Sequence, residues 1–157
     1  MTSMKRRIFL KGTLATGALG IAAGSGLLVP RAVLAAWDKQ AFDAKDINTA
    51  LDSLLGSSSL TASDKIKIKA PDIAENGAVV PVSISTDLPG VESINIVVEK
   101  NPNPLAANFV LGPGALGEVS TRIKMGKSSS VLAVVKAGGK LYSTGKEVKV
   151  TIGGCGG

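Results

Sequence analysis

Hydrophobic residues change their spacing close to residue 64, and the change divides the chain into a helical part and a strand-rich part. In the first part, apolar side chains recur three or four positions apart, which is the spacing of one helix face. These side chains are Ile47, Leu51, Leu54 and Leu55. Gly56 and three serines follow the last of them and end the pattern. We therefore predict an N-terminal α-helix within residues 36–56.

After that point apolar and polar residues alternate in short runs, the pattern of half-buried β-strands. The runs lie at residues 65–69, 80–85, 94–98, 107–111, 119–124, 131–137 and 140–152. The last run forms either one strand or two strands that meet at Gly145. Turns rich in Gly and Pro separate the runs, and Gly138-Gly139 predicts a two-residue hairpin turn. About seven or eight short strands favour a mainly β fold, an antiparallel immunoglobulin-like β-sandwich over residues 57–152.

Two features of these strands predict their places in a sheet. Pro81 has no backbone N–H to donate, so we expect its strand to be an edge strand or to contain a bulge. Another strand alternates isoleucines with lysines at positions 65, 67 and 69. Charged side chains keep a sheet edge from pairing with other chains. We interpret these lysines as protection of an exposed edge, in preference to a binding patch.

The first 35 residues have the pattern of an export signal. A basic start is followed by an apolar stretch rich in Gly and Ala, residues 12–29, and by a small-residue site that predicts cleavage after Ala35. Arg6 and Arg7, followed by Ile-Phe-Leu-Lys, resemble the twin-arginine box of proteins exported in the folded state. We therefore expect a periplasmic protein. The alternative is an uncleaved membrane anchor, because 18 apolar residues are just enough to span a bilayer.

The charge of the chain indicates neither nucleic acid nor a charged membrane as a partner. The formal net charge is +6, but five of the 18 basic residues lie in the first 35 positions, so 13 remain against 12 acidic residues. The sequence has no His and one Cys, which excludes the usual zinc, haem and iron–sulfur sites. We expect no cofactor, no metal site and no enzyme activity, and we expect a partner chain that is exported together with this one.

The only cysteine, Cys155, lies near the C-terminus between Gly153-Gly154 and Gly156-Gly157. Glycines on both sides predict a flexible arm without packing neighbours, so the thiol is presented to other molecules. Fully extended, five residues reach about 17 Å, enough to enter a narrow channel of another protein. No basic side chain is adjacent to activate the thiol, so activation must come from the pocket that receives it. The pattern indicates covalent attachment of a substrate to Cys155 of a carrier.

Several stretches of the chain, together with this arm, resemble the SoxY family of sulfur carriers from bacterial thiosulfate oxidation. The stretches are residues 68–82, 99–104, 120–124 and 153–157. The resemblance implies an immunoglobulin-like domain in a heterodimer with a SoxZ-like subunit. It also implies that Cys155 carries thiosulfate-derived sulfur between partner proteins. These are a SoxXA-type haem protein, a SoxB-type hydrolase and, in some organisms, a sulfane dehydrogenase.

Two other functions stay open from the sequence. Small proteins that end in Gly-Gly can carry sulfur as a C-terminal thiocarboxylate, although an export signal does not fit that cytoplasmic chemistry. A structural or adhesion sandwich is the other alternative, and it would use Cys155 only for a disulfide-linked dimer.

Overall fold

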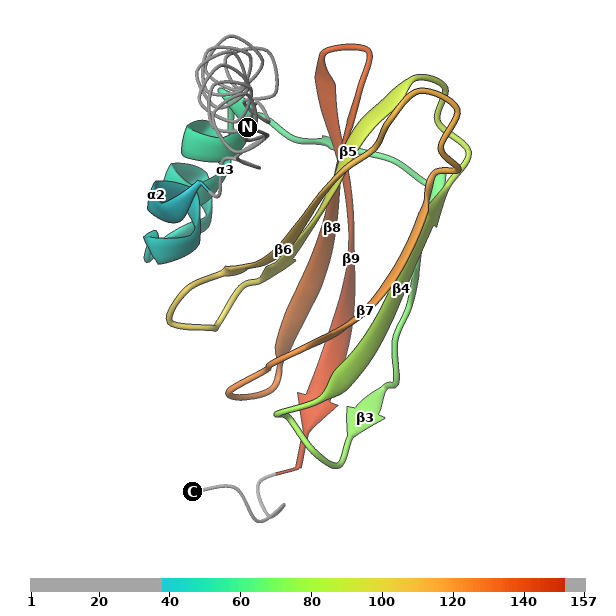
Figure 1. The fold of residues 1–157 in the computed structure, drawn as a ribbon. Helices are drawn as coiled ribbons and strands as arrows, with labels where there is room; N and C mark the ends of the chain where they lie inside the picture. The colour runs from blue at the N-terminus through green and yellow to red at the C-terminus, as the bar shows by residue number, and fades with distance from the viewer. Residues whose placement is uncertain (1–37, 152–157) are drawn as a thin grey trace, which may run out of the picture. The chain divides into compact units, whose positions relative to one another are not determined.

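The computed structural model describes residues 38–151, which form a β-sandwich with two short helices on one side (Figure 1). The predicted export signal with Arg6 and Arg7 lies outside the described residues, and so does the predicted arm with Cys155. The helices are α2 (Lys39–Asp43) and α3 (Ile47–Leu55). Neither is long and apolar enough to cross a membrane.

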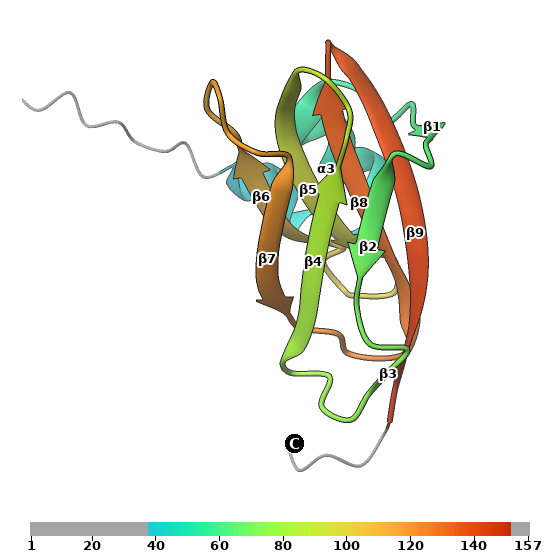
Figure 2. The same cartoon turned by 90° about the vertical axis from the view of Figure 1, so that its right-hand side faces the viewer.

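Two sheets make up the sandwich. The larger sheet has the order β1-β9-β8-β5-β6, with bounds Thr61–Ala62, Lys140–Val150, Ser129–Ala137, Val91–Val98 and Leu105–Val110. The smaller sheet has the order β2-β4-β7, with bounds Ile66–Lys69, Val80–Thr86 and Glu118–Ile123. A further short strand, β3 (Ile73–Ala74), pairs with β9. Figure 2 shows β4 between β2 and β7, and β6 at the edge of the larger sheet.

The core lies between the two sheets and consists of aliphatic side chains. Alternate residues of β4, Val80, Val82 and Ile84, pack against alternate residues of β5 and β8. The opposite face of the larger sheet is also covered, because Leu51 of α3 packs in one cluster with Val97 and Val134. Strands buried on both faces need nearly continuous apolar runs, and this explains the apolar stretch at residues 131–135.

The predicted mainly β, immunoglobulin-like sandwich with antiparallel strands is confirmed. The hairpin at Gly138-Gly139 is confirmed as well, since Ala137 pairs with Lys140 and both glycines have positive φ, 56° and 71°. Strand β9 runs through Gly145 without a break, which settles the choice between one strand and two. A Cβ at Gly145 would lie 2.9 Å from Leu132 Cδ2. The absence of a side chain at Gly145 therefore leaves room for the side chain of Leu132 on the neighbouring strand β8. No periodic pattern predicts β1 and β3, which pair with β9 in parallel.

The expectation for Pro81 is wrong, because its strand β4 is the central strand of the smaller sheet. The structure shows why proline is tolerated there. The pairing of β2 with β4 stops at Lys69 opposite Ser83, so Pro81 lies beyond the end of β2. On its other side, Pro81 pairs with Arg122 of β7. The lysine-rich strand β2, in contrast, is an edge strand, as predicted.

The single predicted helix is two helices, because a second N-cap interrupts the chain. Ala44 has an extended ψ of 144°, and Asp46 then caps α3 by accepting a hydrogen bond from Thr49 N–H at 2.8 Å. Hydrogen bonds from the Thr49 side chain and from its backbone N–H lower the pKa of Asp46 below its ordinary value. Gly56 ends α3 with a φ of 78°, as its position predicts.

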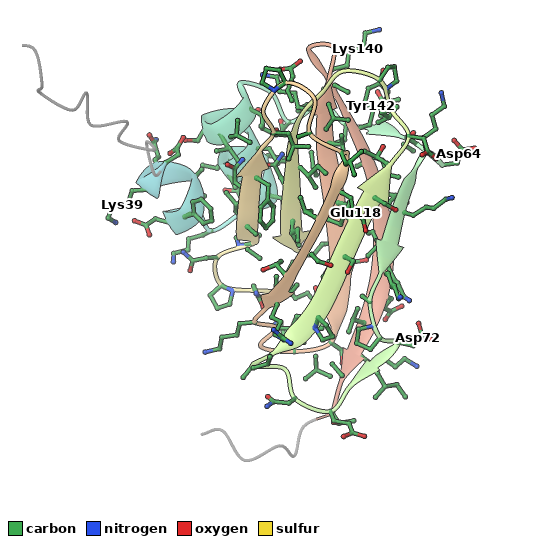
Figure 3. All side chains as sticks on the ribbon, turned by 45° about the vertical axis from the view of Figure 1, so that its right-hand side comes forward. Lys39, Asp64, Asp72, Glu118, Lys140 and Tyr142 are labelled. Atoms are coloured by element: carbon green, nitrogen blue, oxygen red, sulfur yellow. The ribbon has the colours of Figure 1, made fainter. Side chains whose placement is uncertain are left out.

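The two ends of the sandwich are formed by different connections. The arm end is where β9 finishes, together with the connections at residues 70–79, 99–104 and 124–128. The hairpin end holds the connections at residues 87–90, 111–117 and 138–139. In Figure 3, Asp72 is labelled at the arm end, and Lys140 at the hairpin end.

Candidate functional site

The predicted attachment residue Cys155 and its four glycines, Gly153, Gly154, Gly156 and Gly157, lie outside the described residues. The described chain ends at Thr151, four residues before the cysteine. The part of the predicted site that the structure describes is therefore the place where β9 ends and the C-terminal segment begins. We call this place the arm root and define it as residues 72–77, Ser128 and residues 149–151.

Three successive backbone N–H groups at the end of β9 are bound in the arm root. Lys149 N–H donates to the carbonyl of Asp72 at 3.0 Å, and Thr151 N–H donates to the carbonyl of Ala74 at 3.1 Å. Between them, Val150 N–H donates to the hydroxyl of Ser128 at 2.9 Å. Alternate residues of a strand direct their backbone groups to opposite sides, so β3 holds one side of β9 and Ser128 holds the other.

Side chains add to this anchor. The hydroxyl of Thr151 lies 3.4 Å from the carbonyl of Ala74 and 3.3 Å from that of Glu75, and it donates to both. The ammonium of Lys146 lies 3.0 Å from Asp72 Oδ1 and donates to the carbonyl of Ala70 at 2.6 Å. The Asp72 side chain is 88% exposed, so this ion pair contributes little to stability, whereas the bond to the carbonyl fixes the segment before β3.

Gly77 brings three segments together behind the arm root. Its carbonyl accepts a hydrogen bond from Met125 N–H at 2.7 Å. A Cβ on Gly77 would lie 2.4 Å from the Met125 carbonyl oxygen and 2.8 Å from Val150 Cγ1. Only glycine therefore lets the connection after β3, the connection after β7 and the end of β9 approach this closely.

The surface of the arm root and of the residues next to it combines apolar and basic groups. Ile73 and Val79 are large apolar side chains that are 58% and 51% exposed. Lys127 and Lys149 are exposed as well, and neither makes an ion pair in the described part of the chain. An anionic group on the arm would be attracted to the two lysines.

Residues 38–151 contain no cluster of three or more His, Cys, Asp or Glu side chains that could hold a metal ion. Every buried side-chain nitrogen or oxygen in this part of the chain has a hydrogen-bond partner. What the described residues present at this end is an anchor for the C-terminal segment.

Sequence reasoning predicted the arm, which lies outside the described residues, and missed the arm root. Ser128 is one of three consecutive serines, and nothing in the sequence distinguishes the one that binds β9. The two residues of β3 are too few for a periodic pattern, and their partners lie 76 positions further along the chain. The sequence points to the arm root only indirectly. Residues 72–77 fall within residues 68–82, one of the stretches that resemble the SoxY family.

Two comparisons with known proteins found similar proteins. The family model "Sulfur oxidation protein SoxY" matches residues 51–155, a range that includes the arm root and ends on Cys155. The sulfur carrier protein SoxY from Chlorobium limicola f thiosulfatophilum is 47% identical. The match covers 66% of this chain and 94% of that chain, with a TM-score of 0.60.

A second solved structure, the superoxide reductase (neelaredoxin) from Ignicoccus hospitalis, is 24% identical, with a TM-score of 0.50. That match covers 55% of this chain and 80% of that one, and it shows the fold alone. Comparison with curated proteins gave no match. The family model covers well over half of the sequence and extends to the cysteine. This chain therefore belongs to the SoxY family of sulfur oxidation proteins.

Proposed function

We propose that this protein is a periplasmic sulfur carrier that holds thiosulfate-derived intermediates covalently on Cys155. The observation that carries the proposal is the family match, which extends from α3 to Cys155. The sulfur carrier from Chlorobium limicola gives the role that we transfer to this chain. The bonded arm root supports it, because a fixed anchor beside a glycine-flanked thiol separates the rigid handle from the reactive end.

The proposed loading step joins two sulfur atoms. The thiol of Cys155 loses its proton, and a bond forms between its Sγ and the terminal sulfur of thiosulfate while two electrons pass to a SoxXA-type haem protein. Hydrolysis by a SoxB-type enzyme then breaks the bond between that sulfur and the sulfonate group. Water supplies the fourth oxygen of the released sulfate, and a persulfide stays on Cys155. A sulfane dehydrogenase, where present, would oxidise this remaining sulfur.

The carrier itself contributes reach and local concentration. Thr151 is bound to β3, and covalent geometry allows about 14 Å for the four residues from Thr151 to Cys155. Once a partner has docked near the arm root, the tether makes entry of the thiol an intramolecular event. The exposed Lys127 and Lys149 would favour a negatively charged adduct near the anchor.

We also propose that the chain is exported in the folded state through the twin-arginine box at Arg6 and Arg7, together with a SoxZ-type subunit. Family membership supports the partnership. The export route rests on the sequence pattern of the first 35 residues alone. Replacing both arginines by lysine tests it, because twin-arginine export should stop and the protein should stay in the cytoplasmic fraction.

The central experiment is mass spectrometry of the C-terminal peptide after the protein has been exposed to thiosulfate and the haem partner. Wild-type protein should gain an adduct on Cys155, and Cys155→Ser should gain none and should abolish thiosulfate turnover in the reconstituted system. A Cys155→Ser protein that still supports turnover would exclude the carrier role and favour a C-terminal thiocarboxylate. Wild-type protein that forms only a disulfide-linked dimer would favour a structural sandwich.

A further inference from the structure

Apart from the two-residue strands β1 and β3, three edge strands border the sheets within residues 38–151, and they differ in charge. Edge strand β2 carries Lys67 and Lys69, and edge strand β7 carries Glu118 and Arg122. Edge strand β6 carries no charged residue, and none occurs in the whole stretch 101–117. Proteins usually protect an exposed strand edge with charge, so β6 is the edge that lacks this protection.

The backbone of β6 is open on the side away from β5. Leu111 N–H donates to the Glu92 carbonyl of β5 at 2.9 Å, and Phe109 is paired with Ile94. Because backbone groups alternate in direction along an antiparallel strand, those of Asn108 and Val110 face the open edge. No strand lies on this side in the described part of the chain. The edge therefore offers unused donors and acceptors to an added strand.

Large apolar side chains are exposed where β6 ends. Val110 is 79% exposed, and Leu116, in the connection to β7, is 80% exposed. Figure 2 shows this connection projecting beyond the sheets at the hairpin end. These are the two most exposed large apolar side chains among residues 38–151. An uncharged strand edge with two such side chains beside it is typical of a surface that another protein covers.

We propose that β6 and the connection after it, residues 105–116, form the docking surface for the SoxZ-type subunit, which adds a strand to the larger sheet there. The proposal rests on the proposed function, which requires such a partner. Uncharged, apolar interfaces are typical of permanent subunits, whereas enzymes that visit the arm bind transiently. Val110 and Leu116 lie at the hairpin end, opposite the arm root, so a permanent subunit seated on them leaves the arm free.

The test is the binding of the purified mature chain to its SoxZ-type subunit, measured by titration calorimetry for two variants and their matched controls. Val110→Pro removes an N–H that faces the open edge, and Val110→Lys adds a charge to it. Both should weaken binding by at least about tenfold, because one removes a strand-pairing bond and the other buries a charge. Arg122→Pro, at an outward-facing position of edge β7, and Val79→Lys, at the arm end, should bind within about twofold of wild type.

Thermal unfolding of each variant checks that it is folded. We expect Val110→Pro to fold, because proline is tolerated on an edge strand at a position whose N–H is unpaired. Binding by both Val110 variants equal to that of the controls would overturn the proposal. So would a loss of self-association of this chain with unchanged binding of the SoxZ-type subunit, because β6 would then pair with a second copy. Adduct formation on Cys155 is measured in a separate experiment. Unchanged binding by the Val110 variants would therefore overturn the β6 docking surface without affecting the carrier function. A missing adduct would overturn the carrier function without affecting the binding result.

Discussion

The arm end and the hairpin end of the sandwich both depend on glycine, but for different physical reasons. At the arm end, Gly77 is needed because a side chain would collide with Met125 and Val150. At the hairpin end, Gly90, Gly138 and Gly139 have open space around them and are needed because their φ is positive. One end is fixed by contacts between distant segments, and the other by the local geometry of its turns.

The difference matches what each end has to do in a carrier. The arm end holds the start of the C-terminal segment, and its anchor comes from two places in the sequence: the connection at residues 70–79, which contains β3 and Gly77, and Ser128. At the hairpin end, the glycines with positive φ serve to reverse the chain between neighbouring strands. Gly117 departs from the pattern, since it lies at the hairpin end and a Cβ there would be 2.8 Å from the Thr86 carbonyl oxygen.

The largest effect should come from Gly77→Ala. The new Cβ would stand 2.4 Å from the Met125 carbonyl oxygen, so backbone must move and the hydrogen bond from Met125 N–H to Gly77 is strained. We expect the free energy of unfolding to fall by about 3 kcal/mol, measured by urea denaturation. The melting temperature should fall by roughly 10 °C.

Gly112→Ala is the matched control for this substitution. A Cβ on Gly112 would meet no atom within 4 Å, and the φ of this residue is not positive. Its replacement should therefore change the free energy of unfolding by less than about 0.5 kcal/mol. Equal losses for the two variants would contradict the claim that close approach is what the arm end requires.

A smaller effect is expected at the hairpin, where only the dihedral angle matters. Gly138→Ala should lower the free energy of unfolding by about 1–2 kcal/mol, because a side chain disfavours a φ of 56°. Gly138→Asn should lose much less, since Asn-Gly suits a two-residue turn with positive φ at both positions. Chemical denaturation of the two variants side by side measures the difference. If Asn and Ala proved equally harmful, sterics and not φ would govern this end as well.

The hairpin end could be predicted from the sequence better than the arm end. Gly138-Gly139 predicts its turn locally, and the alternation around it predicts the strands, so fold class and hairpin follow from a short window. Strand β3 and the bond from Val150 to Ser128 depend on pairing between residues far apart, which no local pattern contains. Pro81 was misplaced for the same reason, because its tolerance depends on where β2 stops and not on its own neighbours.

The smallest effect, and the one most directly linked to the arm, should come from Ser128→Ala. This change removes the acceptor of Val150 N–H at 2.9 Å and a weaker donation to the Val150 carbonyl at 3.4 Å. We expect the free energy of unfolding to fall by about 1 kcal/mol and hydrogen exchange of the Val150 amide to accelerate by about fivefold. Ser130→Ala is the control, because the Ser130 hydroxyl has no hydrogen-bond partner within residues 38–151. Unchanged protection of Val150 in Ser128→Ala would mean that β3 alone holds the end of β9, and that the arm root is anchored on one side only.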